Sequence, residues 1–362
     1  MSLEPGDIPG LLGFAEDALG QLRLPNGLYC FDRTFDSPVL RGESVRYSIM
    51  VLLGALRRKA SGSEPGVAIE TLHQAIGTRR ATLDVGDLGL LLWAESRMGA
   101  GEATNTTARL DHLSADTQAL DGLPGMEAAW FVLGGVAAVS AGLPARALAD
   151  RAIGHMRSRR SPRSPLFRHT GLDKGRAFLP NFATEIYSLL ALCEIARNDL
   201  AADALTDATR LADTLIALRL PDGGWPWLFD ADRAVVAEPY EVYSVHQDAM
   251  APMALFALAE VSGDRRYSEA AVESSRWGFG HNELGFDFYD QHNRFAHRSI
   301  RREGWAQRTD LAINVALAKS GSQRRANFGG VTVETTCRPY HLGWLLEAWS
   351  GREHLSRLLR SL

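Results

Sequence analysis

Two kinds of apolar segment alternate along this chain. Segments of the first kind are apolar on every side, and a helix with that pattern is buried on all sides. Six stretches have it: residues 47–56, 88–94, 128–141, 186–193, 249–259 and 342–349. We therefore predict six buried helices.

Segments of the second kind are apolar on one face only. In residues 205–216, for example, Leu205, Leu211 and Leu215 fall on one helical stripe. The same pattern occupies residues 8–22, 68–76, 102–120, 144–156 and 267–277. Six buried helices alternating with six amphipathic ones predict an all-α fold, an (α/α)6 toroid whose inner ring of helices is enclosed by an outer ring. A two-layer solenoid of hairpins gives the same alternation, so ring closure is an inference.

Strand signals are sparse. Residues 331–336 are the best short strand candidate, with residues 286–289 as a partner. Two long excursions, residues 157–179 and 280–336, interrupt the helical pattern, and long loops in a compact domain are usually functional. We therefore expect one toroid domain over residues 1–362, with long loops at its mouth and at most a small β-hairpin.

Composition narrows the classes of protein. Of 362 residues, 46% are hydrophobic and 23% charged, and the net charge is −4, which argues against a nucleic-acid or membrane-surface binder. The three cysteines are widely spaced, so neither a disulfide framework nor a cysteine zinc site is expected. With neither a signal peptide nor a membrane-spanning stretch in view, we expect a cytoplasmic protein. The Ala- and Arg-rich usage is typical of a GC-rich bacterium.

The mouth of the predicted ring is where chemistry is expected. All inner helices of a toroid run the same way, so their N-termini, with free N–H groups and partial positive charge, gather at one end. Polar residues near the starts of the buried segments should therefore converge. These residues are Arg46, Tyr47, Asp84, Asp87, Glu127, Asn181, Glu185, Tyr243, His246, Gln247, Asp248, Arg338, Tyr340 and His341.

Asp248 and Glu185 are the predicted acid–base carboxylates. Glu185 enters a buried run, where a carboxylate needs a partner or a function, and an ion pair with an arginine is the alternative. Asp248 belongs to the densest polar cluster of the chain, residues 240–248 (YEVYSVHQD), in which His246 could relay protons, as could His341. Asp84 and Asp87 have the spacing of a capping box, so helix capping is the simpler role for them.

Other residues are predicted to bind substrate. Arg46 and Arg338 suit a carboxylate. Trp225 and Trp227, in the run LPDGGWPW, would stack on a sugar face or staple the loop to the ring, and Tyr243 would add a stacking wall. Gln247, Asn181, Asp87 and Glu127 complete the predicted binding set.

Two further stretches of the chain contain charged residues that were considered for ligand or metal binding. The basic loop at residues 157–176 is either a solvated surface or a lid for an anionic substrate. Asp287, Asp290 and His292 match no established metal-site spacing, so we expect no metal and no cofactor.

The chain resembles the α/α-toroid superfamily over residues 43–351. The resemblance rests on the hairpin pattern, on LPDGGWPW and on VYSVHQDAMAPMALFALAEVSGDRRY, which is similar to segments of toroid proteins encoded near bacterial polysaccharide genes. The superfamily includes six-hairpin glycosidases, unsaturated-uronyl hydrolases, N-acylglucosamine 2-epimerase-like proteins and terpenoid cyclases. The acidic D-x-D-D and D-D-x-x-D motifs of terpenoid enzymes are absent, and so is the G-W-C element of lanthionine cyclases. By elimination, the resemblance implies a sugar substrate.

We therefore expect a carbohydrate-active enzyme, a glycoside hydrolase, lyase or epimerase. Its substrate would be an oligo- or polysaccharide, with uronic acid as one candidate constituent. One alternative is a terpene-cyclase-like enzyme with a dry aromatic cavity and a single buried acid. The other is a non-catalytic glycan-binding or scaffold toroid, which would tolerate alanine at Asp248 and Glu185. We expect no nucleic-acid partner, and the oligomeric state stays open.

Overall fold

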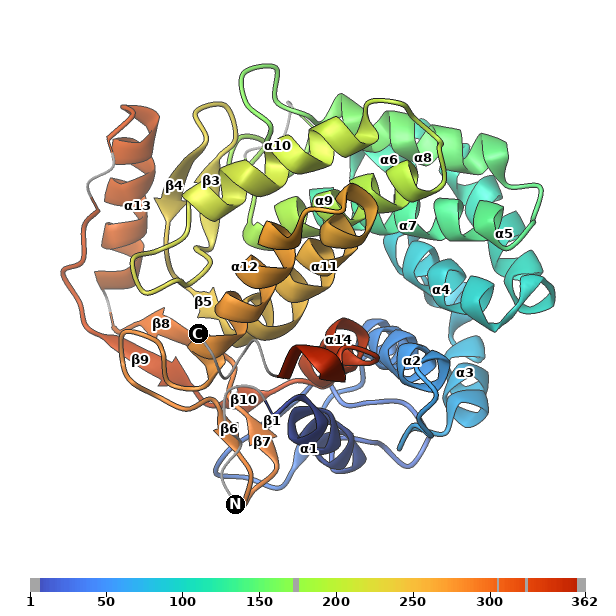
Figure 1. Cartoon of the computed structure of the whole chain (residues 1–362), viewed down its shortest axis with the longest axis horizontal. Coiled ribbons are helices and arrows are strands. Elements are labelled where there is room, and N and C mark those ends of the chain that lie inside the picture. The colour runs from blue at the N-terminus through green and yellow to red at the C-terminus, as the bar shows by residue number, and fades with distance from the viewer. Residues whose placement is uncertain (1–6, 172–175, 305, 323–324, 357–362) are drawn as a thin grey trace.

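The computed structural model describes residues 7–171, 176–304, 306–322 and 325–356. Six helices form a closed inner ring, because each contacts the next and the last contacts the first (Figure 1). In ring order they are α2 (Val45–Ala60), α4 (Val85–Met98), α7 (Gly125–Ser140), α9 (Phe182–Arg197), α11 (Ala251–Ser262) and α14 (Pro339–Trp349). A π-turn, η2 (His246–Met250), precedes α11 directly. The toroid prediction is confirmed, and the open solenoid is excluded.

Six outer helices cover this ring, one against each inner helix. They are α3 (Ile69–Gly77) on α2, α5 (Ala100–Ser114) on α4, α8 (Arg146–Ser158) on α7, α10 (Ala204–Ala217) on α9, α12 (Arg265–Ser275) on α11 and α1 (Ile8–Gly20) on α14. The pairing of α1 with α14 completes the sixth hairpin from opposite ends of the described chain. Short helical turns η1 (Arg80–Thr82), α6 (Thr117–Asp121), η3 (Arg276–Gly278) and η4 (Glu353–Leu355) lie between these elements.

Glycines allow the inner helices to approach closely at two crossings. Between α4 and α7, a Cβ added at Gly89 would lie 2.6 Å from the carbonyl oxygen of Trp130, and one at Gly134 would clash with Gly89. Between α2 and α14, Gly54 and Gly343 meet in the same way. Backbones this close leave no room for side chains, so the glycines set the spacing of the ring.

The described residues contain more β-structure than the sequence predicted. Ten short strands form four small sheets: β10–β1–β2, β3–β4, β5–β8–β9 and β6–β7. The strands are β1 (Asp32–Thr34), β2 (Leu40–Arg41), β3 (Leu228–Asp230), β4 (Val235–Glu238), β5 (Val242–Tyr243), β6 (Tyr289–Asp290), β7 (Phe295–Ala296), β8 (Ser299–Arg302), β9 (Val331–Glu334) and β10 (Thr336–Cys337). They gather on one side of the ring, with β3, β4 and α13 near α10 (Figure 1).

Two details of the second excursion were predicted wrongly. The strand expected at residues 331–336 exists as β9, but it pairs with β8 and not with residues 286–289. The excursion also holds a helix, α13 (Ala306–Lys319), which packs on β4. A buried network anchors this helix, because Arg302 lies 3.0 Å from both Glu238 and Asp310. Pairing over such a sequence distance leaves no local pattern, so short strands escape prediction.

Helix starts at the mouth are fixed by side-chain caps. Ser44, Asp84 and Asn181 each accept a hydrogen bond from a backbone N–H in the first turn of α2, α4 and α9. The capping predicted for Asp84 is thus present. Ser244 is different: its hydroxyl donates to the carbonyl oxygens of His297 and Arg298, so it ties η2 to the β8 side of the mouth and caps no helix.

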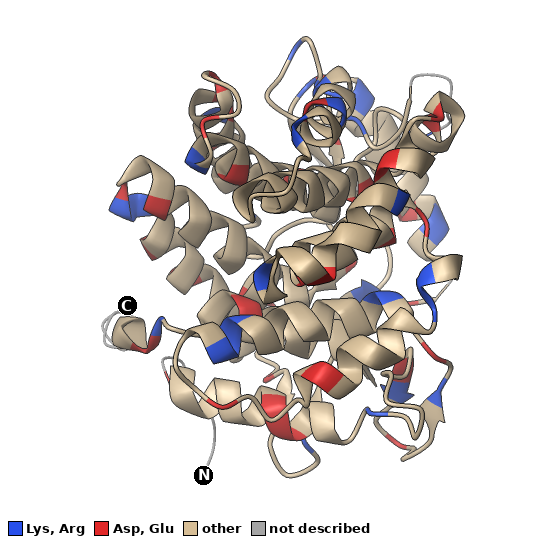
Figure 2. Ribbon diagram, turned by 90° about the vertical axis from the view of Figure 1, so that its right-hand side faces the viewer, with Lys and Arg blue, Asp and Glu red and all other residues tan. Residues whose placement is uncertain are grey.

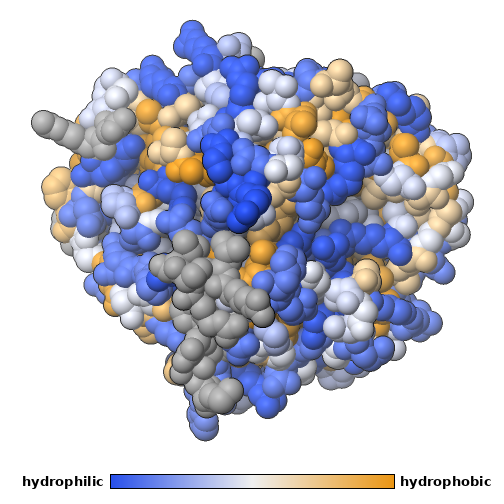
Figure 3. Space-filling model, viewed as in Figure 1, coloured by the Kyte–Doolittle hydropathy of each residue, from blue (hydrophilic) through white to orange (hydrophobic). Residues whose placement is uncertain are grey.

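Charged side chains lie mainly outside the ring. Figure 2 shows Lys, Arg, Asp and Glu as separate blue and red segments on ribbons that are otherwise mostly tan. In Figure 3, apolar residues are interspersed with polar ones on the visible face. Among the described residues, no helix combines the length and apolar character needed to cross a membrane.

Candidate functional site

A small cavity lies among the N-terminal ends of the inner helices. Its volume is about 170 Å³, and α2, α7, α9, η2 and α14 all contribute to its wall. Four of these elements each supply two wall residues that are four positions apart in the sequence. Residues with that spacing lie on the same face of a helix, about one turn apart along its axis. The pairs are Arg46 and Met50, Met126 and Trp130, Ala183 and Tyr187, and His246 and Met250. We call Arg46, Met126, Ala183 and His246 the upper turn and their partners the lower turn. Tyr47 and Tyr340 complete the upper turn.

Arg46 holds three carboxylates at the edge of the cavity. Its Nε donates to Oδ1 of Asp87 at 2.5 Å, and its Nη2 lies 2.9 Å from Oε1 of Glu127 and 3.4 Å from Oδ2 of Asp84. Gly86 makes this possible, because a Cβ there would lie 2.7 Å from the Cβ of Glu127. Three acids around one base leave an excess of negative charge at the edge of the mouth.

The protonation of this cluster is shifted. Burial raises the pKa of Asp87 and of Glu127, and Arg46 lowers each only in part. Burial works against the charge of Arg46, but Asp87 and then Glu127 raise its pKa overall. The result is a permanent cation beside carboxyl groups that hold their protons more tightly than usual, which is a useful property for proton transfer.

Aromatic rings and two arginines form the opposite rim. Tyr47 packs on Tyr340, with ring centroids 4.6 Å apart, and on Phe31 at 5.5 Å. Arg338 donates to the hydroxyl of Tyr47 at 2.9 Å and lies over Phe31. Arg298 lies over Tyr243. Among the described residues, neither arginine has a carboxylate within 4.0 Å, so both charges are available to a ligand.

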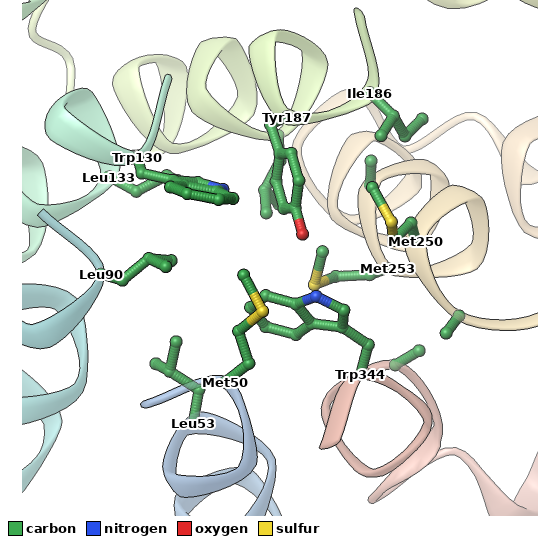
Figure 4. Close-up of a cluster of buried hydrophobic side chains, with 14 of the residues drawn as sticks. Met50, Leu53, Leu90, Trp130, Leu133, Ile186, Tyr187, Met250, Met253 and Trp344 are labelled. Atoms are coloured by element: carbon green, nitrogen blue, oxygen red, sulfur yellow. The ribbon is translucent and has the colours of Figure 1, made fainter. Parts of the chain in front are cut away.

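The lower turn is mostly apolar but contains hydrogen-bond donors. Figure 4 shows Tyr187 directing its hydroxyl toward the axis of the ring, with Met50 and Met250 beside it and Trp344 opposite. Trp130 packs edge-on against Tyr187 at 5.3 Å. The buried indole N–H groups of Trp130 and Trp344 both lie close to the hydroxyl oxygen of Tyr187. Burial raises the pKa of Tyr187 well above its usual value, so its hydroxyl keeps its proton.

His246 is the predicted catalytic residue that the cavity exposes. Its ring lies 4.9 Å from Phe182 and 5.0 Å from Tyr243, and its Nδ1 is buried without a partner among the described residues. Burial, together with Arg298 and His341, lowers its pKa to about 3. His246 is therefore neutral near pH 7 and offers one donor and one acceptor.

Asp248 and His341 lie together, but outside the cavity wall. Nε2 of His341 is 2.8 Å from Oδ1 of Asp248, and the hydroxyl of Tyr289 donates to Oδ2 at 2.7 Å. The indole of Trp349 donates to the backbone oxygen of Asp248. Asp248 is completely buried, and these contacts join η2 to α14 and β6.

Glu185 is also completely buried and faces the 160s loop. Both of its carboxylate oxygens accept from the backbone N–H of Phe167 at 3.1 Å, and burial raises its pKa well above the usual range. Among the described residues, Glu185 forms no ion pair with an arginine, which was the alternative role considered for it. The structure does not bring Glu185 and Asp248 into contact with the cavity.

The remaining residues that were predicted to bind substrate contact other residues of the protein. Trp225 is buried, stacks on Phe182 and donates from Nε1 to Ser274. Gln247 accepts from the backbone N–H of Trp225 at 2.7 Å. Trp227 packs beside β3 and β4, and Asn181 caps α9. Of the two tryptophan roles left open by the sequence, these contacts fit the stapling of the loop to the ring.

The basic loop is largely neutralised where it is described. Arg157 and Arg160 pair with Asp203 and Asp207 at 2.5 and 2.6 Å, and Arg168 lies 3.6 Å from Asp232. Residues 172–175 of this loop lie outside the described part of the chain. In residues 7–171, 176–304, 306–322 and 325–356, no three His, Cys, Asp or Glu side chains are placed to hold a metal ion.

A larger cleft, of about 550 Å³, lies away from the cavity beside the Leu220–Gly223 turn. Two arginines line it: Arg219 is bound to Glu273 at 3.0 Å and to the carbonyl oxygen of Gly223, and Arg276 lies 3.5 Å from Nε2 of His281. We take the smaller cavity as the candidate site, because the N-termini of the inner helices converge there.

The residues of the lower turn are not recognisable as site residues from the sequence. Met50, Trp130, Tyr187 and Met250 look like core residues, since they stand inside uniformly apolar segments. The sequence does contain one signal for these four residues, because each lies four positions after a residue at the start of its helix. Phe31 and Arg298 were missed because they come from loops that only the fold brings to the mouth.

Comparisons with known proteins agree on the fold. No protein-family model matches the chain, and no curated protein does. Among solved structures, unsaturated glucuronyl hydrolase from Bacillus sp. GL1 has a TM-score of 0.59 at 14% identity, covering 95% of both chains. A sugar epimerase from a ruminal bacterium has a TM-score of 0.61 at 11% identity, covering 94% of this chain and 97% of that one.

A third similar structure is a possible member of the GH105 family from Klebsiella pneumoniae. Its TM-score is 0.61 at 8% identity, and the match covers all of this chain and 95% of the other. Identities this low establish a shared α/α-toroid architecture and nothing finer. The predicted resemblance to that superfamily is thus confirmed at the level of fold.

Proposed function

We propose that this protein is a carbohydrate-active enzyme that works at the mouth of the toroid on an oligosaccharide, including oligosaccharides that contain uronic acid. The observation that carries the proposal is the Arg46 cluster, in which Asp87 and Glu127 share one guanidinium beside an aromatic-walled cavity. Paired carboxyl groups next to aromatic rings suit acid–base work on a sugar.

The structural neighbours favour the same class. An unsaturated glucuronyl hydrolase, a sugar epimerase and a possible GH105 member share this architecture over nearly the whole chain. Because fold alone does not fix function, they support the substrate class only together with the site.

Asp87 and Glu127 are the acid and base of this proposal. Glu127, the less exposed of the two, donates a proton to the departing group, and Asp87 accepts one from the attacking water or from the sugar carbon. Burial raises both pKa values, which keeps an acid protonated nearer neutral pH. Asp248 and Glu185, the carboxylates first considered for these roles, instead hold the surrounding structure.

The rim would position the substrate. Tyr47 and Tyr340 present rings for stacking on a sugar face. Arg338 and Arg298, without carboxylate partners among the described residues, suit the carboxylate of a uronic acid. His246 is neutral and would exchange hydrogen bonds with sugar hydroxyl groups.

The terpene-cyclase alternative is weaker. It calls for a dry, aromatic cavity with a single buried acid. Here the upper turn contains the charged Arg46, which three carboxylates surround. Turnover in an oligosaccharide assay would distinguish an enzyme from a purely glycan-binding toroid.

The experiment is an assay on a panel of oligosaccharides. The panel contains unsaturated-uronyl di- and tetrasaccharides made with polysaccharide lyases, their saturated forms and neutral counterparts, with products followed by mass spectrometry. We expect turnover of at least one member. Asp87→Asn and Glu127→Gln should each lower kcat by about 100-fold or more with little change in KM, the usual contribution of an acid or base.

Asp84→Asn is the matched control. Asp84 contacts the same arginine, but it is more exposed and caps α4, and asparagine caps equally well. Its kcat should stay within about twofold of the wild type. Undiminished kcat in both Asp87→Asn and Glu127→Gln would overturn the assignment, and binding without turnover would establish the non-catalytic alternative.

A further inference from the structure

The larger cleft, which the proposed chemistry does not use, lies at the same end of the ring as the cavity. One wall is the end of α10 with the turn at residues 220–223, and the other is η3 with the loop after it. An outer helix runs antiparallel to its inner partner, so α10 ends near the start of α9. On the other side, η3 contacts η2 directly. The cleft is therefore close to the mouth.

A single loop separates the cleft from the cavity. Arg219, in the wall of the cleft, has its guanidinium 5.2 Å from the ring of Trp225. Trp225 stacks on Phe182 at 5.2 Å, and Phe182 lies 4.9 Å from His246, which lines the cavity. Three successive contacts therefore connect the two sites, and a chain of a few linked sugar units could extend from one to the other.

The cleft contains an arginine without a carboxylate partner. Within the part of the chain that the structure describes, no carboxylate lies within 4.0 Å of Arg276, and its buried Nε atom has no acceptor. Its Nη2 atom lies 3.5 Å from Nε2 of His281, whose pKa is lowered by burial and then by Arg276. Arg219, in the same cleft, is instead paired with Glu273. Arg276 thus offers a free cation to an anionic ligand.

Hydrogen-bond acceptors line another part of the cleft. A second cleft, of about 320 Å³, adjoins the first, and Asp222 and Glu283 line both. Asp222 accepts a hydrogen bond from the indole of Trp277 at 3.2 Å, and Glu283 accepts one from the hydroxyl of Tyr240 at 2.6 Å. A carboxylate has about four lone-pair sites, so both groups can also accept from ligand hydroxyl groups.

Two adjoining clefts with these groups suit a linear, hydroxylated and anionic chain. We propose that they form a second glycan-binding site, which holds a distant part of an acidic polysaccharide while the same chain is bound at the mouth. Such a chain carries its charges at intervals, so one anionic group can pair with Arg276 while hydroxyl groups donate to Asp222 and Glu283. This inference rests on the proposed function and extends its substrate class to anionic polysaccharides.

The first test measures binding of polysaccharides by affinity electrophoresis in native gels. The gels contain polygalacturonate, alginate, chondroitin, chondroitin sulfate or neutral dextran, and every protein also carries Glu127→Gln to suppress cleavage. We expect at least one anionic polymer to retard the protein and dextran to have no effect. Arg276→Gln should weaken that binding about tenfold or more, because hydrogen bonds to a charged group are lost. Retardation by no anionic polymer would overturn the inference. The carboxylate and sulfate polymers identify which anion is bound.

Arg265→Gln is the matched control. It removes the same charge from the start of α12, where Arg265 is exposed and lies 3.7 Å from Glu269, so retardation should not change. Arg276→Lys keeps the charge but not the planar guanidinium, so it should keep part of the affinity, and thermal melting checks that each variant is folded. Equal losses in Arg265→Gln and Arg276→Gln would show that net charge alone drives binding, and would overturn the inference.

The second test asks whether one chain occupies both sites. In the enzyme with Glu127 intact, Arg276→Gln should raise KM for the bound polymer about tenfold and leave kcat unchanged, because linked contacts strengthen each other. For disaccharides, which are too short to reach the cleft, neither constant should change. An unchanged KM for the polymer, or turnover of oligosaccharides without turnover of any polymer, would overturn the inference.

The two proposals fail in different ways. Turnover of oligosaccharides without any polymer binding that depends on Arg276 overturns this inference and leaves the proposed function intact. Polymer binding that depends on Arg276, without turnover of any substrate, supports the second site and overturns the proposal that the protein is an enzyme.

Discussion

Some residues near the mouth line the cavity, and others stabilise the elements that form its walls. His246 and Asp248 are two positions apart, yet only His246 contributes to the cavity. Asp248 is directed toward His341 and Tyr289 instead. Residues two positions apart on a helical turn do not share a face, so the two side chains of the His246–Met250 turn point in different directions.

Asp248→Asn tests whether that carboxylate is structural. An amide weakens the contacts to His341 and Tyr289 within a completely buried site, so the free energy of unfolding should fall by about 2 to 4 kcal/mol. Chemical denaturation measures this. In the exposed helix cap Asp264, the same change should cost less than about 0.5 kcal/mol. Unchanged stability with a kcat reduced 100-fold or more would instead make Asp248 catalytic.

The sequence predicts which residues lie near the mouth, but it does not predict the direction in which each side chain points. The sequence placed Arg46, Asp87, Glu127 and His246 at one mouth, because helix starts in a toroid must converge. Arg46 and His246 do line the cavity, and Asp87 and Glu127 are bound to Arg46. The sequence could not assign their roles. Whether a carboxyl faces solvent, a base or a backbone N–H depends on side-chain direction within a turn, as Glu185 and its Phe167 contact illustrate.

At the scale of elements, the inner helices are positioned by close backbone contact. The crossing of α4 and α7 depends on Gly89 and Gly134, and that crossing also brings Glu127 against Gly86. The spacing of two helices therefore determines the spacing of Asp87 and Glu127. The helices themselves were predictable from their apolar pattern, but the small strands and α13 were not, since their stability comes from distant partners.

Gly89→Ala should separate α4 from α7. Its new Cβ would lie 2.6 Å from the carbonyl oxygen of Trp130, which is backbone and has little freedom to move. We expect a loss of about 2 to 3 kcal/mol in the free energy of unfolding, together with weaker activity.

Gly13→Ala provides the control for this substitution. Gly13 lies in α1 with no atom within 4 Å of its added Cβ, so alanine there should stabilise the protein by up to about 1 kcal/mol. Equal thermal melting of the two variants would show that the crossing tolerates separation.

At the scale of the whole molecule, buried neutral histidines couple stability to pH. Burial lowers the pKa of His155, His169 and His297 to about 4 and that of His246 to about 3. In the unfolded chain these groups take up protons below about pH 6.5. Acid therefore favours the unfolded chain between about pH 6.5 and pH 4, and stability is fully present only above that range.

His297→Gln measures one part of this effect. His297 is 5% exposed and lies outside the cavity wall. The variant should lose less stability on acidification than the wild type, by about 1 kcal/mol per pH unit between pH 6 and pH 5. Denaturation curves at several pH values give the difference. Parallel pH dependence of the two proteins would mean that His297 is protonated in the folded state, and His292→Gln, at an exposed position, should match the wild type throughout.

The pairing of α1 with α14 has a consequence for how the ring is made. Some 320 residues separate α1 from α14, so the helix that covers the last inner helix leaves the ribosome well before its partner does. Until α14 follows, the apolar face of α1 lacks that partner and the cavity wall that carries Tyr340 is incomplete. We therefore expect the interval before α14 is synthesised to be a stage at which the chain is exposed to chaperones and misassembly.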